Sequence, residues 1–252
     1  MAIASRLDRR SANSEITVVK IVARIHANRL IAALPAADRQ RLLGALQPVS
    51  LRIRERLYDA GEPPKFVYFP LSGVHSIVTT VPDGDPIEVA TVGNEGMVGI
   101  QMFLGGRSTR DEAFCQVPGD VLRMRAARFQ DEVLRSRAFH TVMLHYTQAF
   151  IRQIAQQAAC NRLHSIVERC ASRLLMTRDR VNVDEFVLTQ ESLAQMLGVR
   201  RATVTAAAGM LQRAGSIRYT RGRITIVNRK KLGRASCQCD RIIRREYRRL
   251  LG

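Results

Sequence analysis

The sequence predicts an α+β protein in which an N-terminal antiparallel β-roll is followed by a long helix and a C-terminal winged helix-turn-helix. Three observations lead to this prediction. Short β-branched and aromatic runs alternate with turn residues in the first half, glycine and proline are then absent from residues 128–157, and a helix-turn-helix pattern follows. The 252 residues are enough for two domains, and a hydrophobic content of 46% is normal for a globular protein.

The first two segments are an arm and the roll. Residues 1–25 are expected to be a flexible arm, because they are too polar and too charged for a secretory signal. Residues 26–127 are expected to form the β-roll with flanking helices, since runs such as 66–69, 77–81 and 87–92 have the composition of strands. Glycine, proline, asparagine and aspartate separate these runs at intervals typical of an antiparallel sandwich or barrel.

The stretch without glycine and proline predicts one long helix. Apolar residues recur in it at a spacing of three or four, namely Phe139, Met143, Tyr146, Phe150 and Ile154. Such a stripe packs either on its own domain or on a second copy of the chain. If two copies of the chain paired through this stripe, the second helix of each helix-turn-helix would be held at a fixed separation. Successive major grooves on one face of DNA lie ~34 Å apart, which such a homodimer could match. Residues 128–158 are therefore interpreted as a dimerisation helix, with Gln153 and Gln157 near the seam.

The segment from Leu188 to Leu211 carries the pattern of a helix-turn-helix within a domain spanning residues 159–232. Thr189 is suited to cap the first helix, and Gly198 to the positive φ of the tight turn. The residues expected to face inward are Leu193, Ala194, Leu197, Val204, Ala207, Ala208 and Leu211. Residues 216–227 then read as two short strands around a turn at 221–223, which makes a basic-tipped wing. A plain helix pair with a basic face is the alternative, and the wing argues against it.

The exposed residues of this motif are the candidate DNA-binding site. Arg201 is expected to read a guanine edge, and Thr205 a base edge or a thymine methyl group. The residues expected to contact mostly phosphates are Arg200, Thr203, Thr189 and Gln190 in the motif, and Arg221 and Arg223 in the wing.

The charge balance fits a nucleic-acid partner. A net charge of +18 and a pI near 11.1 produce a positive field that attracts a polyanion. RNA readers stack bases on exposed aromatic side chains, but the wing offers only Tyr219, so duplex DNA is favoured. No segment reaches the ~20 apolar residues that span a bilayer, so no membrane partner is expected and a cytoplasmic location is predicted.

Several runs together resemble the bacterial catabolite activator and fumarate-nitrate regulator (Crp/Fnr) family of transcription factors. They are residues 57–62 (LYDAGE), the turn 70–73 (PLSG), and 193–199 (LAQMLGV) with 201–204 (RATV). The resemblance covers residues 30 to 232 approximately. It implies a dimer that regulates transcription initiation, often by contacting RNA polymerase, and a roll that senses an effector.

The chain departs from the family members that bind cyclic AMP. Those members hold the ribose with a glutamate after a glycine and the phosphate with an arginine-serine pair, where this sequence has Gly99-Ile100 and Glu112-Ala113. A carboxylate would repel the phosphate, so cyclic AMP is not expected in the usual pose and the effector is unknown. Arg107 and Arg110 are candidates for an alternative anion site, or are simply solvated loop residues.

The recognition helix also departs from the type members. The guanine-reading arginine of the family corresponds to Arg201, but the next glutamate is replaced by Ala202 and a second arginine by Ala206, so the operator is expected to differ.

The five cysteines are too few and too scattered for a disulfide scaffold. The first is Cys115, so the N-terminal cluster of the iron-sulfur sensors is lacking and no cofactor is predicted. No metal site is assigned. Cys237 and Cys239, with Cys160 or Cys170 nearby, are the candidates for a soft metal or an oxidation switch, and buried thiols are the alternative. The Cys-x-Cys lacks the paired spacing of a structural zinc site. His164, four residues after Cys160 on a predicted helix, is either a further ligand or a structural hydrogen-bonding residue.

Three alternative functions and the C-terminal segment complete the predictions. The chain carries no Walker loop, His-Glu-x-x-His motif, nucleophile elbow or dinucleotide fingerprint, so it is not predicted to be an enzyme. An architectural DNA binder without an effector and a redox- or metal-responsive regulator are the alternatives to an effector-sensing regulator. Residues 233–252 are expected to be a basic helical tail, which either packs back on the DNA-binding domain or extends its basic surface.

Overall fold

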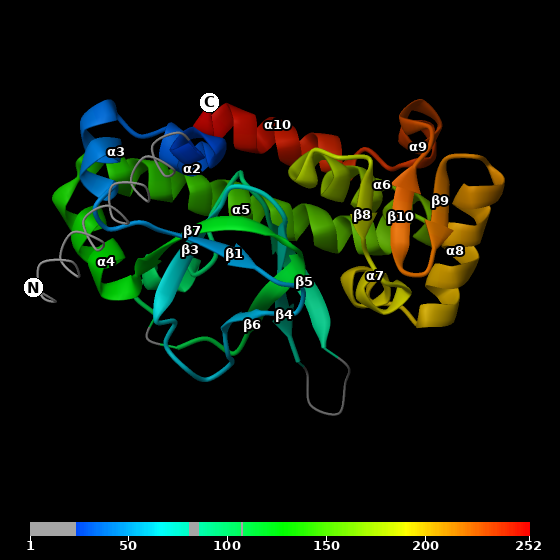
Figure 1. Ribbon diagram of the computed structural model, residues 1–252, viewed down its shortest axis with the longest axis horizontal. Coiled ribbons are helices and arrows are strands. Elements are labelled where there is room, and N and C mark those ends of the chain that lie inside the picture. Colours follow the sequence, from blue (N-terminus) through cyan, green and yellow to red (C-terminus); the bar gives the residue numbers. More distant parts are fainter. Residues whose placement is uncertain (1–23, 81–85, 107) are drawn as a thin grey trace, which may run out of the picture.

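The computed structural model describes residues 24–80, 86–106 and 108–252 and confirms the predicted α+β fold (Figure 1). Most of the predicted arm (1–23) and Arg107 lie outside the described residues. A β-roll occupies one end of the molecule and a winged helix-turn-helix the other, and long helices run between them (Figure 1). Within the described residues no helix is both long and apolar enough to cross a membrane.

The roll consists of two antiparallel sheets. The strands are β1 (Gln47–Leu51), β2 (Arg56–Tyr58), β3 (Phe66–Pro70), β4 (Val74–Thr79), β5 (Ile87–Val92), β6 (Glu112–Val117) and β7 (Gly119–Arg125). One sheet has the order β1-β7-β3 and the other β2-β6-β4-β5. The turn before β4 requires glycine, because Gly73 has a φ of 81° and an added Cβ would lie 2.6 Å from the carbonyl oxygen of Val117.

Short helices cover the roll. They are η1 (Ile25–Ala27), α2 (Arg29–Ala32), α3 (Ala36–Leu42) and η2 (Ile100–Met102), followed after β7 by α4 (Ala126–Arg135). Asn28 caps α2 and its buried amide donates to the carbonyl oxygens of Pro70 and Gly96, so the first helices are tied to the strand ends. Phe69, Phe129 and Phe139 are fully buried between the sheet and the helices.

The prediction of one long helix was wrong in one respect, because the segment forms two helices. α4 ends at Arg135, and α5 (Arg137–Leu163) begins after Ser136, which has an extended backbone (φ −122°, ψ 112°). The Ser136 hydroxyl accepts a hydrogen bond from the Phe139 amide at 3.0 Å. The apolar spacing around Ser136 is compatible with a continuous helix. The serine hydroxyl nevertheless takes the hydrogen bond of a backbone amide, so Ser136 becomes the N-cap of a new helix.

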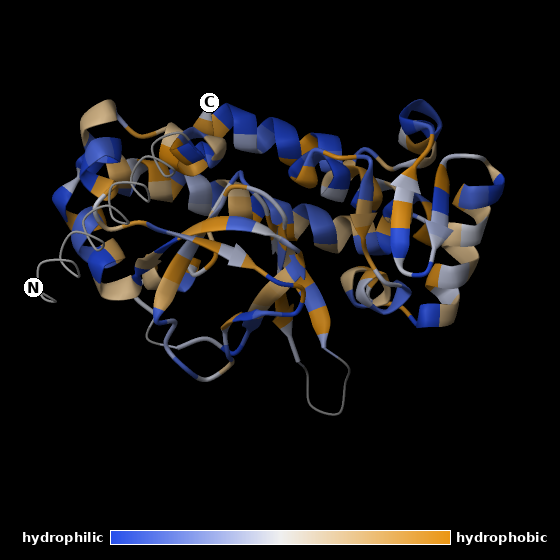
Figure 2. Cartoon of the chain, in the orientation of Figure 1, coloured by the Kyte–Doolittle hydropathy of each residue, from blue (hydrophilic) through white to orange (hydrophobic). Residues whose placement is uncertain are grey.

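The apolar stripe of α5 packs within its own chain rather than forming a free seam. Phe139, Met143, Tyr146 and Phe150 are buried against the roll, and the Tyr146 hydroxyl donates to the carbonyl oxygen of Met97 at 2.7 Å. Figure 2 shows this concentration of hydrophobic residues where the roll meets α5. Of the five stripe residues only Ile154 is exposed, at 39%. The helical period of α5 was therefore predicted correctly. The prediction that a second copy of the chain covers the apolar stripe was wrong for the four residues that pack on the roll.

The two predicted seam glutamines are also placed differently. Gln153 is buried and donates to the carbonyl oxygen of Thr91 at 2.8 Å, while its own Oε1 accepts from the Tyr247 hydroxyl at 3.1 Å. Gln157 donates to Asn161 on the same helix at 3.0 Å. Gln153 thus satisfies buried polar groups inside one chain.

The C-terminal domain is a winged helix-turn-helix, as predicted. Its elements are α6 (Ile166–Val181), β8 (Glu185–Val187), α7 (Gln190–Leu197), α8 (Arg201–Arg213), β9 (Ile217–Thr220), β10 (Arg223–Ile226) and α9 (Arg229–Ala235). α6 begins with a reciprocal capping box between Ser165 and Glu168. The two predicted wing strands are β9 and β10. A third strand, β8, pairs with β10, so that the sheet order is β8-β10-β9.

The basic tail forms α10 (Cys239–Leu251), which lies along α5 (Figure 1). The two predicted arrangements missed its main contact, because Ile243, Tyr247 and Leu251 join the core of the roll, although Arg244 also pairs with Asp179 of the DNA-binding domain. The Tyr146 and Tyr247 rings lie 6.3 Å apart between centroids. The arginines of α10 occupy its other face, which gives it strong amphipathicity and a largely hydrophilic colour in Figure 2.

Two buried arginines of α6 fasten the DNA-binding domain to the roll. The Arg180 guanidinium pairs with Glu95 at 2.5 Å and donates to the Thr91 hydroxyl at 2.7 Å. Arg173 lies 3.3 Å from Glu88, whose other carboxylate oxygen accepts from Ser76. Burial raises the pKa of Glu88, and Arg173 partly offsets this by favouring its ionised form. These pairs fix the direction in which α7 and α8 face.

Candidate nucleic-acid interface

The helix-turn-helix is built by a cap, a glycine turn and a small-residue crossing. The Thr189 hydroxyl accepts from the Ser192 amide at 3.0 Å, which confirms the predicted cap of α7. Gly198 has a φ of 61° and ends that helix, and the Val199 amide then donates to the carbonyl oxygen of Ala194. All residues predicted to face inward are buried, namely Leu193, Ala194, Leu197, Val204, Ala207, Ala208 and Leu211.

The N-terminal part of α8 presents its polar residues to solvent. Arg200, Arg201, Thr203 and Thr205 are all exposed. Gln190 of α7 joins them, since its Oε1 accepts from the Thr205 hydroxyl at 3.0 Å and from Arg201 Nε at 3.4 Å. The hydrogen bond from Arg201 Nε to Gln190 is weak because it is long. The guanidinium therefore lies near α7 but can exchange Gln190 for another acceptor. Sequence reasoning treated these three residues separately, whereas the structure brings them together.

The wing turn is shorter than predicted. Thr220 and Arg223 are paired across β9 and β10, which leaves only Arg221 and Gly222 in the turn, with φ values of 50° and 76°. Two successive positive φ values match the twist of a hairpin. Arg223 lies in β10 and pairs with Glu185 at 2.9 Å, while Arg221 is exposed at the tip. Tyr219 donates its hydroxyl to the carbonyl oxygen of Leu188 and so has a structural role.

An open cleft of about 790 Å³ connects the recognition helix with the wing tip. Five of the predicted DNA-binding residues line it: Thr189, Gln190, Arg201, Thr205 and Arg221. Arg200 lines a neighbouring cleft of about 720 Å³, on the side of the roll. Thr203 and Arg223 are exposed away from these linings.

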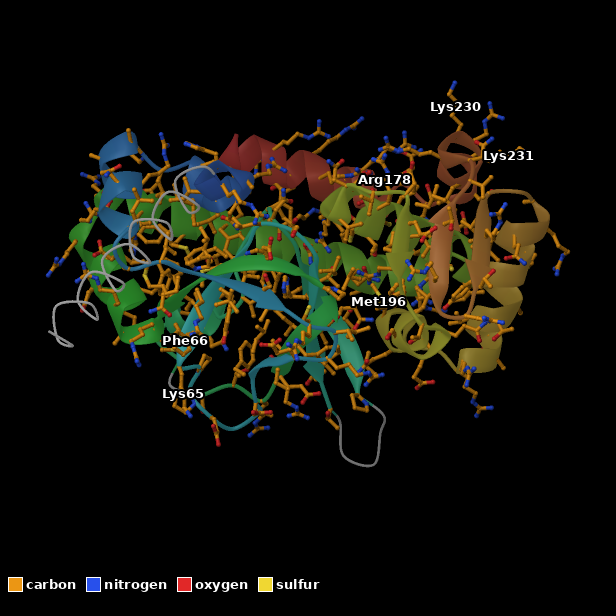
Figure 3. The ribbon with its side chains drawn as sticks, viewed as in Figure 1. Lys65, Phe66, Arg178, Met196, Lys230 and Lys231 are labelled. Carbon is orange, nitrogen blue, oxygen red and sulfur yellow. The ribbon has the colours of Figure 1, made fainter. Side chains whose placement is uncertain are left out.

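Two further basic features border the domain, and the sequence analysis did not assign them to the site. Arg54, in the turn before β2 of the roll, lines both clefts. No sequence signal marks it, because its position depends on how the two domains pack. Lys230 and Lys231 of α9 point outward from the opposite end of the domain from α7 in Figure 3. The exposed cations therefore surround the domain, with the recognition helix on one side of it.

The two positions that the family resemblance led us to compare with cyclic-AMP contacts are Ile100 and Glu112. Ile100 is buried in η2. Glu112, at the start of β6, lies 3.2 Å from Arg56 Nη1. The Tyr58 hydroxyl is buried beside Gln101, and burial raises its pKa above the usual range. Arg110 is exposed in its loop.

The cysteines fall into three places. Cys115 is buried in the roll and Cys170 in the core of the DNA-binding domain. Cys160, Cys237 and Cys239 form a separate buried cluster beside His164, so the partner of the Cys-x-Cys pair is Cys160 rather than Cys170. The hydrogen bond between the Cys160 and Cys237 thiol groups lowers the pKa of Cys237 and raises the pKa of Cys160.

Two family models match this chain. The Crp-like helix-turn-helix domain matches residues 168–235, and the cyclic nucleotide-binding domain matches residues 48–136. The chain belongs to the Crp/Fnr family. As a Crp/Fnr protein it is a transcription regulator with a helix-turn-helix DNA-binding domain, and the family consists of regulators rather than enzymes.

Named relatives and solved structures agree with this assignment. The global nitrogen regulator of Nostoc sp. is 24% identical over 206 residues, which cover 77% of this chain and 92% of the relative. FixK2 from Bradyrhizobium japonicum has a TM-score of 0.65 at 20% identity, covering 76% of this chain and 98% of the other. A transcriptional regulator of the family from Eubacterium rectale has a TM-score of 0.63 at 18% identity, with coverages of 80% and 94%. At these identities the structural likeness concerns the fold.

Proposed function

We propose that this Crp/Fnr regulator binds an inverted-repeat operator in duplex DNA as a homodimer, with α8 in the major groove and the wing turn on the backbone. One observation carries the proposal: Arg201 and Thr205, exposed on the N-terminal part of α8, form one polar group with the half-buried Gln190 of α7, in an open cleft that ends at Arg221. This is the part of a recognition helix that reaches base edges. Arg201 reads a guanine and Arg221 contacts phosphate.

A second face of α5 supports the dimer. Six exposed residues follow one another at alternating spacings of three and four: Thr141, Leu144, Gln148, Ile151, Ala155 and Ala158. This is a heptad repeat, the pattern of two helices that wind around each other. Leu144 and Ile151 are 51% and 61% exposed in the single chain. The seam of the dimer is therefore this stripe, and it replaces the buried stripe expected from sequence.

The same proposal includes a roll that is not gated by cyclic AMP in the usual pose. Ile100 offers no hydrogen-bond acceptor for a ribose hydroxyl, and Glu112 puts a carboxylate where the family places an arginine for the phosphate. Arg56 partly neutralises Glu112 but lies on the neighbouring strand β2. Contact with RNA polymerase follows from the family resemblance and completes the proposal.

The test is selection of bound sequences from a random duplex library by the full chain, run in parallel with and without cyclic AMP at moderate salt. We expect an inverted repeat in both arms, with half-site centres about one helical turn apart. The Arg201→Ala variant is run beside the wild type and is expected to lose selectivity at one base pair of each half-site. A motif without symmetry would contradict the homodimer, and a motif obtained only with nucleotide would contradict cyclic-AMP independence.

The dimer is tested separately by sedimentation of the Ile151→Glu variant. Two opposed carboxylates in the seam repel each other and lose apolar burial, so the variant is expected to sediment as a monomer where the wild type is a dimer. Ile242→Glu is the matched control, because Ile242 is an exposed isoleucine of α10 outside the heptad stripe. Equal effects of the two substitutions would contradict the assigned seam.

A further inference from the structure

Four potential metal ligands converge where α5 ends and α10 begins. Cys160 lies in the last turn of α5 and His164 directly follows that helix, while Cys237 precedes α10 and Cys239 is its first residue. Their ligand atoms, three sulfurs and a ring nitrogen, all lie within 4.8 Å of one another. The two segments are distant in sequence, so only the packing of α10 on α5 creates the group.

Two of the distances in this group match those of a single tetrahedral ion, and the others are within 4.8 Å. With metal–sulfur bonds of ~2.3 Å and metal–nitrogen bonds of ~2.05 Å, tetrahedral geometry requires sulfurs about 3.8 Å apart and sulfur to nitrogen about 3.6 Å apart. The Cys160 and Cys237 sulfurs are 3.6 Å apart, and the Cys239 sulfur is 3.6 Å from Nδ1 of His164. An iron-sulfur cluster would keep its ligands farther apart than one ion does, so the spacing fits a mononuclear site.

The surroundings are those of a charged group rather than of core thiols. The three cysteines form a buried cluster of their own, apart from the hydrophobic cores of the roll and the DNA-binding domain. Gln156 donates to the Cys239 sulfur at 3.2 Å, as hydrogen-bonding partners of metal ligands do. Arg169 lines the same small cavity as Cys160 and Cys239, and its Nε is buried with no hydrogen-bond partner in the described part of the chain. Its guanidinium would offset the net negative charge of three thiolates on a divalent ion.

We propose that Cys160, His164, Cys237 and Cys239 bind one Zn²⁺ ion per chain and that the ion fastens α10 to the junction between α5 and α6. Three thiolates and one imidazole are a ligand set of closed, four-coordinate zinc sites, which stabilise folds rather than catalyse reactions. His164 is partly exposed, which gives the ion an entry path, whereas the three cysteines are buried. His164 also follows the last residue of α5, and Ser165 next to it caps α6, so the site lies where α5 meets the first helix of the DNA-binding domain.

The first experiment measures zinc content and does not require DNA, so its outcome is independent of the proposed operator binding. The full chain is stripped of metal under reducing conditions, reloaded with Zn²⁺, desalted and assayed for bound metal. We expect one ion per wild-type chain, with Co²⁺ in its place giving the visible absorption of a tetrahedral thiolate site. Cys237→Ser with Cys239→Ser should abolish binding, and His164→Gln should weaken it by more than tenfold. Gln156→Leu should weaken it by roughly 10- to 100-fold.

Cys170→Ala is the matched control, since Cys170 is equally buried but lies outside the cluster, and it should keep the full zinc content. Loss of zinc in the double cysteine variant could also result from misfolding. His164→Gln tests this alternative, because His164 is partly exposed and belongs to neither hydrophobic core, so this variant should fold normally. Hydrogen exchange should show the amides of residues 237–251 protected in the loaded protein and faster after stripping. Failure of the reduced wild type to retain zinc, or equal zinc in the double variant, would overturn the proposal. A Cys160–Cys237 disulfide as the only chemistry of the cluster would overturn it as well.

Discussion

The arginines at the domain junction and those on the recognition face are the same residue type used in opposite ways. Arg173 and Arg180 are 6% and 9% exposed and are neutralised by buried glutamates. Arg200, Arg201 and Arg221 are exposed, and no ion pair is formed by them within the described residues. The net charge of +18 indicates that the protein attracts a polyanion. The burial of each arginine determines whether its guanidinium can contact that polyanion.

The physical reason is the cost of moving a charge between environments. A buried guanidinium is costly unless it is paired and hydrogen-bonded, so Arg180 cannot leave Glu95 to bind a phosphate. An exposed pair is worth little, so Arg201 exchanges its weak contact with Gln190 at small cost. The junction thus fixes the orientation of the motif, and the exposed arginines are the ones that can reach a polyanion.

The largest effect is expected from breaking the junction. Glu95→Gln leaves the Arg180 charge buried without a counter-charge and should lower the free energy of unfolding by about 3–5 kcal/mol. Urea unfolding of the two proteins measures this difference. The control is Glu185→Gln, which breaks the exposed pair with Arg223 and should change stability by less than about 1 kcal/mol. Similar losses in both variants would show that burial does not distinguish the two regions.

The next effect concerns the recognition face. Arg201→Ala should weaken binding to the selected operator by ~1–3 kcal/mol and relax the preference at one base pair per half-site, because a bidentate guanine contact is lost. Competition binding against single-base operator variants measures both quantities. The stability of the free protein should stay within about 0.5 kcal/mol, since Arg201 is exposed. Equal losses on the operator and on random duplex would contradict base reading by Arg201.

A pH effect of intermediate size is expected at the buried side of the junction. Burial lowers the pKa of His75 from 6.5 to about 4, and the nearby Arg180 acts in the same direction. The unfolded chain therefore binds more protons between these values, and the contribution of neutral His75 to stability is lost as pH falls through this range. From pH 7 to pH 5 the wild type should lose about 2 kcal/mol relative to His75→Leu. Paired urea titrations at the two pH values measure it, and parallel changes in the two proteins would argue against a neutral buried His75.

The smallest effects are expected in the wing. Arg221→Ala should weaken all duplexes alike and reduce the slope of log affinity against log salt by about 1. Arg223→Ala should act in the same direction but less strongly, because Glu185 already neutralises part of the Arg223 charge. Salt titrations on random duplex compare the two variants. A larger effect of Arg223→Ala would place the backbone contact on β10 rather than at the turn.

What the sequence predicted correctly is mostly local. The Thr189 cap, the Gly198 turn and the buried face of the helix-turn-helix follow from residues a few positions apart, and each is confirmed. The helical period of α5 is also local, but what covers a face depends on distant segments, and here the roll and α10 cover the stripe that was expected to form the dimer seam. Arg54 beside the recognition helix could not be predicted for the same reason.

The cysteine cluster is another case in which contacts between distant segments could not be predicted from the sequence. Cys237 and Cys239 were recognised as a pair, yet the choice between Cys160 and Cys170 depended on where α10 packs, and the sequence left the place of the tail open. Ser136 is a smaller example, because one side-chain hydrogen bond divides a segment whose composition favours a continuous helix.

α10 lies beyond the residues that either family model matches, yet its side chains complete the core of the first domain. The hydrogen bond between Gln153 and Tyr247 joins residues 94 positions apart, with the whole DNA-binding domain between them. On the ribosome, the roll and α5 are therefore made well before the helix that covers them, and their apolar surface stays open until the DNA-binding domain has also been synthesised. The domain that is synthesised first is thus completed only by residues 243–251.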